Sequence, residues 1–496
     1  MAWKDLPAKP NIVLIITDQQ RSLQHWPSDW VATHLPNMQR LIDTGMTFTN
    51  AFSAANECSP SRATFVTSTY DTINKIWRTA PPQNLPTQLP NLATVLQKAG
   101  YQTNWRGKWH LLAQPASNLD AYGFAGWDPP DAGTSLGNDS TLGGGHPDND
   151  GRYAADAVTF LQNYTSSDPF LLVVSLVNPH DVHVYTEDWV KAGYPSDIPD
   201  MGVGLPGNYD DPLTAKPGAQ LAFRDSFDSS SSFKFDPPNT THEGYVNFYA
   251  YLQTVVDQEI GKVLCALHDA GFTDNTLVVR MADHGEMGMS HKLREKMYVA
   301  YDEAIHVPLI FSNPRAFPQG VTTDAFASLL DLVPTLASVA GLPAQDGLLG
   351  KDLTPVLSGT QPSVQDAVLY VYDDQYNVDD SVTPTHIRAV RTAGWMYSVY
   401  FSESNPELPP EFELYDMAVD PGQLTNLLNP ANFDPAIVPT WVALNTQLFE
   451  LMLQNEASGP APGLPASAEL GLALLEAAKA PGALVSAAGE PWLEGK

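Results

Sequence analysis

Apolar runs of strand length alternate along this chain with segments in which apolar residues recur at helical spacing. Residues 11–16 (NIVLII) and 170–177 (FLLVVSLV) are nearly continuous apolar runs, which are typical of strands buried on both faces. Residues 153–164 and 244–271 carry apolar side chains three or four positions apart and predict amphipathic helices. This alternation favours an α/β fold in which helices surround a large, mostly parallel sheet.

The pattern changes near residue 365, where short segments with polar turns begin. We expect antiparallel strands in residues 367–374, 386–402 and 412–421. The sequence thus predicts a main domain over residues 1–365, with a surface insertion at about residues 205–241. A smaller α+β subdomain with a short antiparallel sheet would follow over residues 366–430. Residues 431–496 read as a helix and an Ala-, Gly- and Pro-rich tail.

The charge of the chain restricts its partners. Its 496 residues include 26 Lys and Arg against 56 Asp and Glu, which gives a formal net charge of −30. Such a surface repels nucleic acids and anionic membranes, so we expect neither as a partner. It also opposes the approach of an anionic substrate. Basic side chains gathered in one pocket would therefore be informative.

The cysteines and the N-terminus indicate the compartment. Cys58 and Cys265 cannot form a disulfide framework, and Cys265 falls on the apolar side of a helical pattern. The N-terminal residues leave no room for a secretory signal, and no stretch reaches the roughly 20 apolar residues that span a bilayer. We therefore expect a cytoplasmic enzyme.

Polar side chains follow four of the predicted strands. Ligands in open parallel sheets bind beyond the carboxyl ends of the strands, so these side chains are candidates for one site. In chain order they are Asp18 and Gln19, Lys108 and His110, His180, and Asp283 and His284.

Two of these strand ends offer the ligands of a metal ion. Asp18, Gln19 and Asp283 supply hard oxygen donors that suit Ca²⁺ or Mg²⁺, and the nitrogen of His284 also allows Mn²⁺. A single Asp at a strand end more often caps the following helix, and an isolated His is more often structural. Two acid-plus-donor pairs at separate strand ends favour a metal site over two caps.

Short motifs identify a resemblance. Residues 58–62 (CSPSR) resemble the C-x-P-S-R signature of the type I sulfatases, which belong to the alkaline phosphatase superfamily. Residues 11–19 are similar to the opening strand and metal site of that family. Further similar elements follow in the family's order over about residues 10–430, namely GKWHL at 107–111, NPH at 178–180, ADHGE at 282–286 and ELYDMAVDPGQLTNL at 413–427.

The resemblance implies a covalent modification and a metal. In this family a formylglycine-generating enzyme oxidises the signature cysteine, here Cys58, to formylglycine before the chain folds. The hydrated aldehyde is the nucleophile and a metal ligand. One divalent cation is implied, Ca²⁺ in the first place with Mn²⁺ and Mg²⁺ as alternatives, and its ligands would be Asp18, Gln19, Cys58, Asp283 and His284.

The resemblance also assigns roles to the basic residues. Arg62 and Lys108 would stabilise the diol, and His110 would take the proton that triggers sulfate release. His180 and a later lysine would hold the sulfate oxygens and protonate the leaving alcohol. The spacing to Pro308 favours Lys296 over Lys292 for that lysine.

Three functions remain open at this point. The first is hydrolysis of an aryl or small alkyl sulfate monoester, a small-molecule substrate. The second is hydrolysis of a phosphonate monoester or phosphodiester with the same nucleophile, because Asp18-Gln19 and Asp283-His284 are more similar to choline sulfatases and phosphonate monoester hydrolases than to many arylsulfatases. The third is a non-catalytic binding homologue. The position of the tail resembles extensions of the choline sulfatase group, so a homo-oligomer is a hypothesis.

Overall fold

A large mixed sheet organises the protein. The computed structural model describes residues 3–22, 26–113, 116–136, 143–186, 189–230, 233–375, 377–431 and 433–457. The sheet has seven strands in the order β3-β4-β1-β5-β6-β2-β7, and β6 alone among them runs antiparallel to its neighbours. The strands are β1 (Asn11–Asp18), β2 (Gly45–Phe52), β3 (Gln102–Gly107), β4 (Phe170–Pro179), β5 (Thr276–Ala282), β6 (Leu309–Ser312) and β7 (Val321–Ser328).

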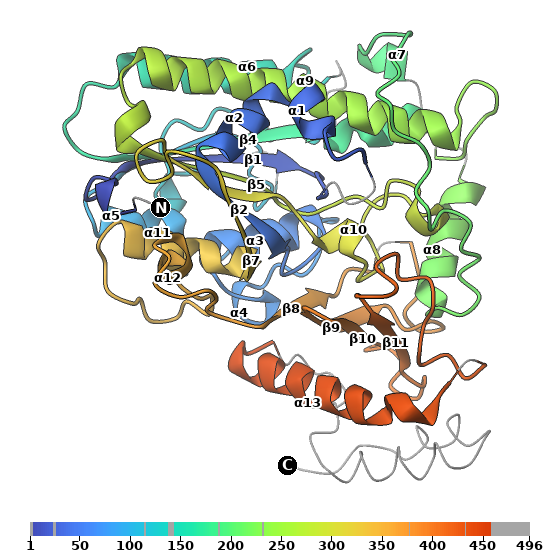
Figure 1. The fold of residues 1–496 in the computed structure, drawn as a ribbon. Helices are drawn as coiled ribbons and strands as arrows, with labels where there is room; N and C mark the ends of the chain where they lie inside the picture. Colours follow the sequence, from blue (N-terminus) through green and yellow to red (C-terminus); the bar gives the residue numbers. More distant parts are fainter. Residues whose placement is uncertain are drawn as a thin grey trace.

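Helices cover both faces of this sheet (Figure 1). On one face lie α1 (Trp30–His34), α2 (Pro36–Asp43), α6 (Asn149–Asn163) and α9 (His242–Asp269). On the other lie α3 (Cys58–Thr67), α4 (Asp71–Asn74), α5 (Leu92–Gln97), α11 (Leu332–Val339) and α12 (Thr354–Leu357). The short helices α7 (Trp189–Ala192) and α10 (Asp302–Ile305) and the longer α8 (Gly218–Ser229) lie toward one end.

The continuous apolar run of β1 follows from burial on both faces. Ile12 and Leu14 pack into the cluster that contains residues of α3, α5 and α11. Val13 and Ile15 point the opposite way, into the cluster that contains residues of α6 and α9. Successive side chains of a strand alternate between the faces of a sheet, so a strand covered twice has no polar face. The predicted α/β fold with a mostly parallel sheet is confirmed.

A second sheet lies beyond the first. It has four antiparallel strands in the order β11-β10-β9-β8 and is backed by α13 (Figure 1). These elements are β8 (Ala367–Tyr372), β9 (His386–Thr392), β10 (Trp395–Phe401), β11 (Glu411–Asp416) and α13 (Val438–Gln454). The predicted antiparallel sheet is confirmed.

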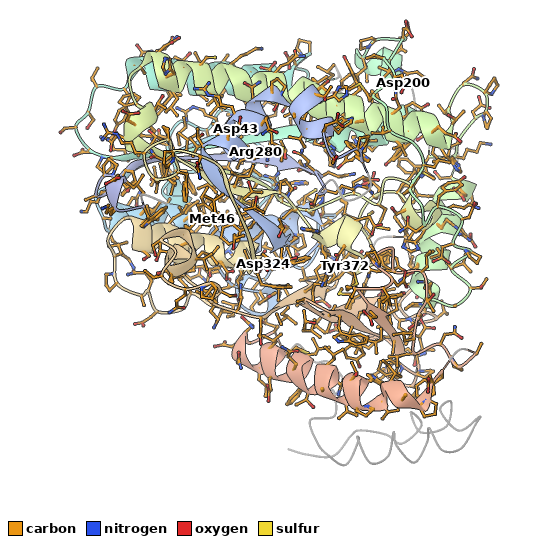
Figure 2. All side chains as sticks on the ribbon, viewed as in Figure 1. Asp43, Met46, Asp200, Arg280, Asp324 and Tyr372 are labelled. Atoms are coloured by element: carbon orange, nitrogen blue, oxygen red, sulfur yellow. The ribbon has the colours of Figure 1, made fainter. Side chains whose placement is uncertain are left out.

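The two sheets share a core. Tyr372 at the end of β8 is fully buried and belongs to the same apolar cluster as Phe52 of β2 and Phe326 of β7. Figure 2 shows Tyr372 between the small sheet and the main body, whereas Met46 and Arg280 lie within the large sheet. The small sheet and the main body of the protein therefore pack together through one apolar cluster.

Within the part of the chain that the structure describes, one helix is long and apolar enough to cross a membrane by length and composition, namely the segment Pro435–Gln454. The sequence pattern gave no such expectation. In the structure Trp441, Leu444 and Leu448 of this segment are buried in a cluster with residues of the small sheet. A helix that packs one face on a sheet passes the same test of composition, so the finding is weak evidence for a membrane span.

The structure also shows where the sequence pattern was incomplete or wrong and what it leaves untested. Strands β2 and β7 were not anticipated, because their polar threonines interrupt the apolar pattern. Cys265 is exposed on α9, so its place on the buried side of the helix was wrong. The insertion expected at residues 205–241 stays a prediction; within it Leu213 and Phe223 are buried. The tail beyond residue 457 lies outside the described residues.

Candidate active site

Four adjacent strand ends build the site. Strands β3, β4, β1 and β5 are neighbours and all parallel, so their carboxyl ends meet at one edge of the sheet. Each end delivers part of the predicted residue set, and helix α3 begins at the same edge with Cys58. The structure thus brings together residues that are far apart in the sequence.

Four side chains converge as a candidate metal centre. The ligand atoms of Asp18, Cys58, Asp283 and His284 all lie within 4.8 Å of one another, and all four residues are buried. The Sγ atom of Cys58 lies 3.1 Å from His284 Nε2 and 3.5 Å from Asp18 Oδ1. His284 Nε2 is 3.6 Å from Asp18 Oδ1 and 3.8 Å from Asp283 Oδ1.

The donor set fits a divalent cation. His284 Nδ1 lies 3.0 Å from the carbonyl oxygen of Gly285, which accepts its proton and leaves the lone pair of Nε2 directed at the cluster. The Oδ1 atoms of both carboxylates lie near His284 Nε2, and a cation there would offset their charge together with Arg62, which pairs with their Oδ2 atoms. Oxygen donors with one imidazole suit Ca²⁺, Mg²⁺ or Mn²⁺. The residues present therefore fit the predicted metal.

Gln19 joins the cluster through its backbone. Its N–H donates to Asp283 Oδ1 at 3.1 Å, while its side-chain oxygen accepts a hydrogen bond from Lys296 Nζ at 2.6 Å. The side-chain amide donates to Glu286 Oε2 at 2.5 Å. In this arrangement Gln19 links the metal cluster to Lys296.

Helix α3 begins at residue 58 and is buried along its whole length. Every residue from Cys58 to Thr67 is buried, and Ser61 donates a hydrogen bond to the carbonyl oxygen of Asp283. Burial, with the nearby Asp18 carboxylate, raises the pKa of the Cys58 thiol to about 12. An unmodified Cys58 is therefore a neutral thiol at neutral pH, and a thiol in that form is a poor nucleophile.

Arg62, one turn after Cys58, holds both metal-site carboxylates. Its Nη2 atom lies 2.9 Å from Asp18 Oδ2 and 2.9 Å from Asp283 Oδ2, and its side chain is fully buried. Its Nη1 atom donates to the carbonyl oxygen of Lys108 and to Ser175 Oγ. Arg62 therefore fixes the spacing between the strand ends.

Lys108 and His110 follow strand β3. Lys108 Nζ lies 2.6 Å from Asp18 Oδ2 and 3.9 Å from Cys58 Sγ. Burial lowers the pKa of Lys108, but nearby anions, Asp18 foremost, outweigh burial and raise it overall. Burial and the charge of Lys108 hold the pKa of His110 well below its ordinary value. Lys108 is thus a cation beside position 58, and His110 is a neutral imidazole that can accept a proton.

His180 follows strand β4 and, like His110, is a neutral imidazole. Burial and the charge of Lys108 hold its pKa well below the ordinary value. Among the described residues, no hydrogen-bond partner reaches the Nδ1 atom of either His180 or His110. Nearby His183 directs its Nδ1 atom to the carbonyl oxygen of His180 at 2.8 Å.

The structure separates the two candidate lysines. Lys296 is 3% exposed, and its Nζ atom binds Gln19 Oε1 and Glu295 Oε2. Lys292 lies at the surface, where its Nζ atom is 3.4 Å from Asp210 Oδ1. Lys296 is therefore placed at the site and Lys292 away from it.

Sequence reasoning missed several acidic residues around this centre. Glu286 and Glu295 bind Gln19, while Asp131 accepts the backbone N–H groups of Trp109 and His110. Glu286 stands inside the ADHGE motif and could have been found there. Nothing in the pattern distinguishes Glu295 or Asp131 from a surface carboxylate.

Comparison with known proteins decides the family. The profile of the family described as sulfatase matches residues 10–342, and the profile described as N-sulphoglucosamine sulphohydrolase, C-terminal, matches residues 289–452. The chain belongs to the sulfatase family. The predicted resemblance is confirmed, and this sulfatase is an enzyme.

Relatives of this sulfatase differ in substrate. The ulvan-active sulfatase of Formosa agariphila is 28% identical over 462 residues, which cover 90% of this chain and 83% of that protein. The choline-sulfatase of Rhizobium meliloti is 26% identical over 457 residues, which cover 84% of this chain and 82% of that protein. A phosphonate monoester hydrolase structure from Silicibacter pomeroyi superposes with a TM-score of 0.69 at 24% identity, covering 90% and 93% of the two chains.

Proposed function

We propose that this sulfatase hydrolyses a sulfate monoester with formylglycine, formed from Cys58, as its nucleophile. The carrying observation is the position of residue 58, which touches Asp18 and His284 of the candidate metal centre and faces Lys108. Arg62, Lys108 and Lys296 gather three cationic side chains near residue 58 in a chain of net charge −30. With a divalent cation to offset Asp18 and Asp283, these side chains would form an anion pocket and support an anionic substrate. The proposed substrate class is an aryl or small alkyl sulfate.

The residues divide the chemistry among them. Asp18, Asp283 and His284 would hold the divalent cation, which would supply Lewis acidity at residue 58 and at a sulfate oxygen. Lys108 and Arg62 fix the Asp18 carboxylate and place positive charge beside the oxygen of residue 58 that attacks sulfur. That attack breaks the bond between sulfur and the ester oxygen.

Proton transfers complete the cycle. Lys296 has a pKa raised well above its ordinary value, because Glu295 and other nearby anions outweigh burial, so it is protonated and can serve the leaving alcohol. Neutral His180 can hold a sulfate oxygen by donating its ring N–H. Neutral His110 takes the proton of the second hydroxyl at residue 58, the carbon–oxygen bond to sulfate then breaks, and the aldehyde reforms. Addition of one water molecule to the aldehyde restores the diol and supplies the water that hydrolysis consumes.

Phosphonate monoester or phosphodiester hydrolysis is the second candidate function. The specific observation is the Asp-His pair at the second metal-binding strand end, Asp283-His284, together with the fold shared with a phosphonate monoester hydrolase. Sulfate monoesters and phosphonate monoesters both carry one negative charge on a tetrahedral centre. The same inner residues therefore suit both, and we expect some turnover of each.

Two measurements test this proposal. Mass spectrometry of the peptide that contains residue 58, from protein co-produced with a formylglycine-generating enzyme, should show the loss of sulfur that accompanies conversion to the aldehyde. The converted enzyme, loaded with Ca²⁺, Mn²⁺ or Mg²⁺ in turn, should then hydrolyse nitrophenyl sulfate faster than a phenylphosphonate ester. An intact thiol in converting cells would favour the non-catalytic homologue. Faster phosphonate hydrolysis would favour the second candidate function.

The same assay addresses the leaving group. The names of two relatives refer to ulvan and to choline, which differ greatly in chemistry. The substrates assayed should therefore include choline sulfate and a sulfated sugar beside nitrophenyl sulfate. A preference for the sulfated sugar would contradict the proposed aryl or small alkyl class without contradicting sulfate hydrolysis.

A further inference from the structure

Lys296 reaches the anion pocket already paired with a carboxylate. Its Nζ atom lies 2.9 Å from Glu295 Oε2, and the side chains of Lys296 and Glu295 are only 4% and 9% exposed. The same Glu295 oxygen accepts the side-chain amide of Gln19 at 3.2 Å. A buried carboxylate beside the lysine removes part of the attraction that the pocket offers an anion. Attraction of an anion to Lys296 therefore does not explain the presence of Glu295.

The backbone holds this carboxylate firmly in place. Glu295 has a φ of 64°, in the left-handed region that residues other than glycine adopt at a cost. Its N–H donates to Glu286 Oε1 at 2.9 Å, and its carbonyl oxygen accepts the N–H of Met287 at 2.8 Å. The surrounding structure thus imposes the conformation that directs Glu295 at Lys296.

The other ion pairs of the pocket have a different purpose. Arg62 pairs with Asp18 and Asp283, and Lys108 pairs with Asp18. Both of these carboxylates belong to the candidate metal centre, where a divalent cation would offset them. Glu295 is not part of the four-residue cluster, although Gln19 connects the two. Among the carboxylates that act on Lys296 it has the largest effect, and it pairs directly with the Nζ atom.

We propose that Glu295 is a specificity-determining residue that makes this sulfatase select monoanionic esters over dianionic ones. The proposal depends on the function proposed above, because it concerns the anion that reaches Lys296. Sulfate monoesters, phosphodiesters and phosphonate monoesters carry one negative charge, whereas a phosphate monoester carries nearly two at neutral pH. Repulsion from a fixed carboxylate is about twice as strong for a dianion as for a monoanion at the same position.

The same charge favours release of the product. Hydrolysis converts a monoanionic ester into inorganic sulfate, a dianion. Glu295 therefore repels the product more strongly than the substrate, which lowers inhibition by sulfate. A residue that merely positioned Lys296 would act differently, because its loss would reduce the turnover of every ester by the same factor.

The experiment separates the charge of the substrate from its central element. We would measure kcat/KM for 4-nitrophenyl sulfate, bis(4-nitrophenyl) phosphate and 4-nitrophenyl phosphate with the converted wild-type enzyme and with Glu295→Gln. Loss of the carboxylate should raise the ratio of phosphate monoester to sulfate turnover about tenfold, which corresponds to about 1.4 kcal/mol. The ratio of phosphodiester to sulfate turnover should stay within about twofold. The inhibition constant of inorganic sulfate should fall about tenfold relative to KM for the sulfate ester.

A matched control exists nearby in the chain. Asp210 forms the corresponding pair with Lys292 at the surface, with 90% and 37% of the two side chains exposed. Asp210→Asn removes the same charge from the whole molecule and should leave all three ratios unchanged. If Glu295→Gln gives no folded protein by its unfolding midpoint, Glu295→Ala takes its place in the comparison.

The outcomes distinguish this inference from the function on which it depends. Unchanged ratios in a Glu295 variant that still hydrolyses the sulfate ester would overturn the inference alone. If the converted wild-type enzyme hydrolysed none of the three esters, the proposed function would fail. Calorimetric titration with inorganic sulfate and with methyl sulfate would then test Glu295 directly. In that titration the variant should gain affinity for the dianion about tenfold more than for the monoanion, and an equal gain would refute the inference.

Discussion

At the residue scale, Lys296 and Lys292 offer a direct comparison of two cations four positions apart. Lys296 is buried against Gln19 and Glu295, whereas Lys292 is partly exposed and paired with Asp210. Removing one preorganised donor to a developing charge typically costs ~100-fold or more in turnover. We expect Lys296→Ala to lower kcat/KM for the sulfate ester by about that factor. Lys292→Ala should change kcat/KM by less than about twofold.

The comparison needs steady-state kinetics on fully converted protein. Unfolding midpoints of both variants should be measured as well, since Lys296→Ala leaves Glu295 without its ion pair. Equal effects of the two substitutions on kcat/KM would show that the anion is held elsewhere.

Asp150 makes a separate prediction about pH. It is buried near the end of β4, where its oxygens accept the N–H groups of Val177 at 2.6 Å and Asn178 at 3.0 Å. Burial nevertheless raises the pKa of Asp150 to about 7. The folded protein therefore binds this proton more tightly than the unfolded chain, and stability is lost as the pH rises from about 4 through 7, by about 1 kcal/mol per pH unit.

Asp150→Asn should remove this dependence. The variant loses one hydrogen bond, since its amide nitrogen cannot accept an N–H, so it should be less stable than the wild type at pH 5 by about 1 kcal/mol. Its free energy of unfolding should then change less than that of the wild type between pH 5 and pH 8. Denaturant titrations at both pH values give the comparison, and parallel slopes for the two proteins would contradict the assignment.

At the element scale, the segment that carries Lys296 is tied to the predicted insertion. His291 is fully buried; its Nδ1 atom lies 2.7 Å from Asp211 Oδ2, and its Nε2 atom faces the side-chain amide of Asn208 at 3.1 Å. Arg294 reaches Asp228 on α8 at 3.4 Å. Residues 205–241 thus anchor the loop that holds Glu295 and Lys296, in addition to any contact with substrate.

Cutting this anchor should loosen the loop before it affects the sheet. His291→Ala should raise hydrogen exchange at the N–H groups of Met287 and Met289, which close the loop by binding the carbonyls of Glu295 and Leu293. It should also lower kcat/KM several-fold, since Lys296 loses a fixed position. Exchange in β1 should remain unchanged and serves as the internal reference. Equal acceleration in β1 and the loop would indicate global destabilisation instead.

The strand ends show how much of the candidate site could be predicted from the sequence. Asp18, His180 and Asp283 were found because each stands at the end of a strongly apolar strand, and parallel neighbouring strands must end at one edge. Lys108 was found at the end of the mixed, strand-like segment Gln102–Gly107. The pairing of Gln19 with Glu295 joins residues 276 positions apart, and no local pattern signals it. β2 and β7 were missed for a related reason, since tertiary pairing stabilises strands whose own sequences alternate weakly.

At the scale of the whole molecule, the small sheet is joined to the site. Asp374, two residues after β8, accepts the N–H of Thr79 at 2.9 Å, and Thr79 Oγ1 accepts the N–H of Ser59 beside Cys58 at 3.3 Å. Burial and Asp374 raise the pKa of Glu57, the residue before Cys58, well above its ordinary value. The C-terminal sheet therefore contributes to the surroundings of residue 58, the proposed nucleophile.

A buried ion pair between the small sheet and the main body tests how much their contact stabilises the protein. Arg391 of β9 binds both carboxylate oxygens of Asp302 on α10 at 2.9 Å, with 8% and 10% of the side chains exposed. Asp302→Ala leaves the guanidinium buried without its partner and should cost about 3 kcal/mol of unfolding free energy. The exposed pair of Arg315 and Asp274 is the control, and Asp274→Ala should cost less than ~1 kcal/mol.

The unfolding curves carry a second result. Because the sheets share an apolar cluster, both should unfold in one transition, seen as coincident curves by tryptophan fluorescence and circular dichroism. Two separated transitions would show that the small sheet is an independent unit.

If residue 58 is converted as proposed, the complete enclosure of helix α3 has a consequence for how this protein must be produced. Residue 58 is 2% exposed, and its neighbours on the helix are equally covered. An enzyme that modifies residue 58 has to contact this side chain, which the sheet and the helices cover in the folded protein. The proportion of competent molecules is then decided during synthesis. Treating purified, folded protein with the modifying enzyme would leave that proportion unchanged. Only chains unfolded in denaturant would become accessible to the modifying enzyme again.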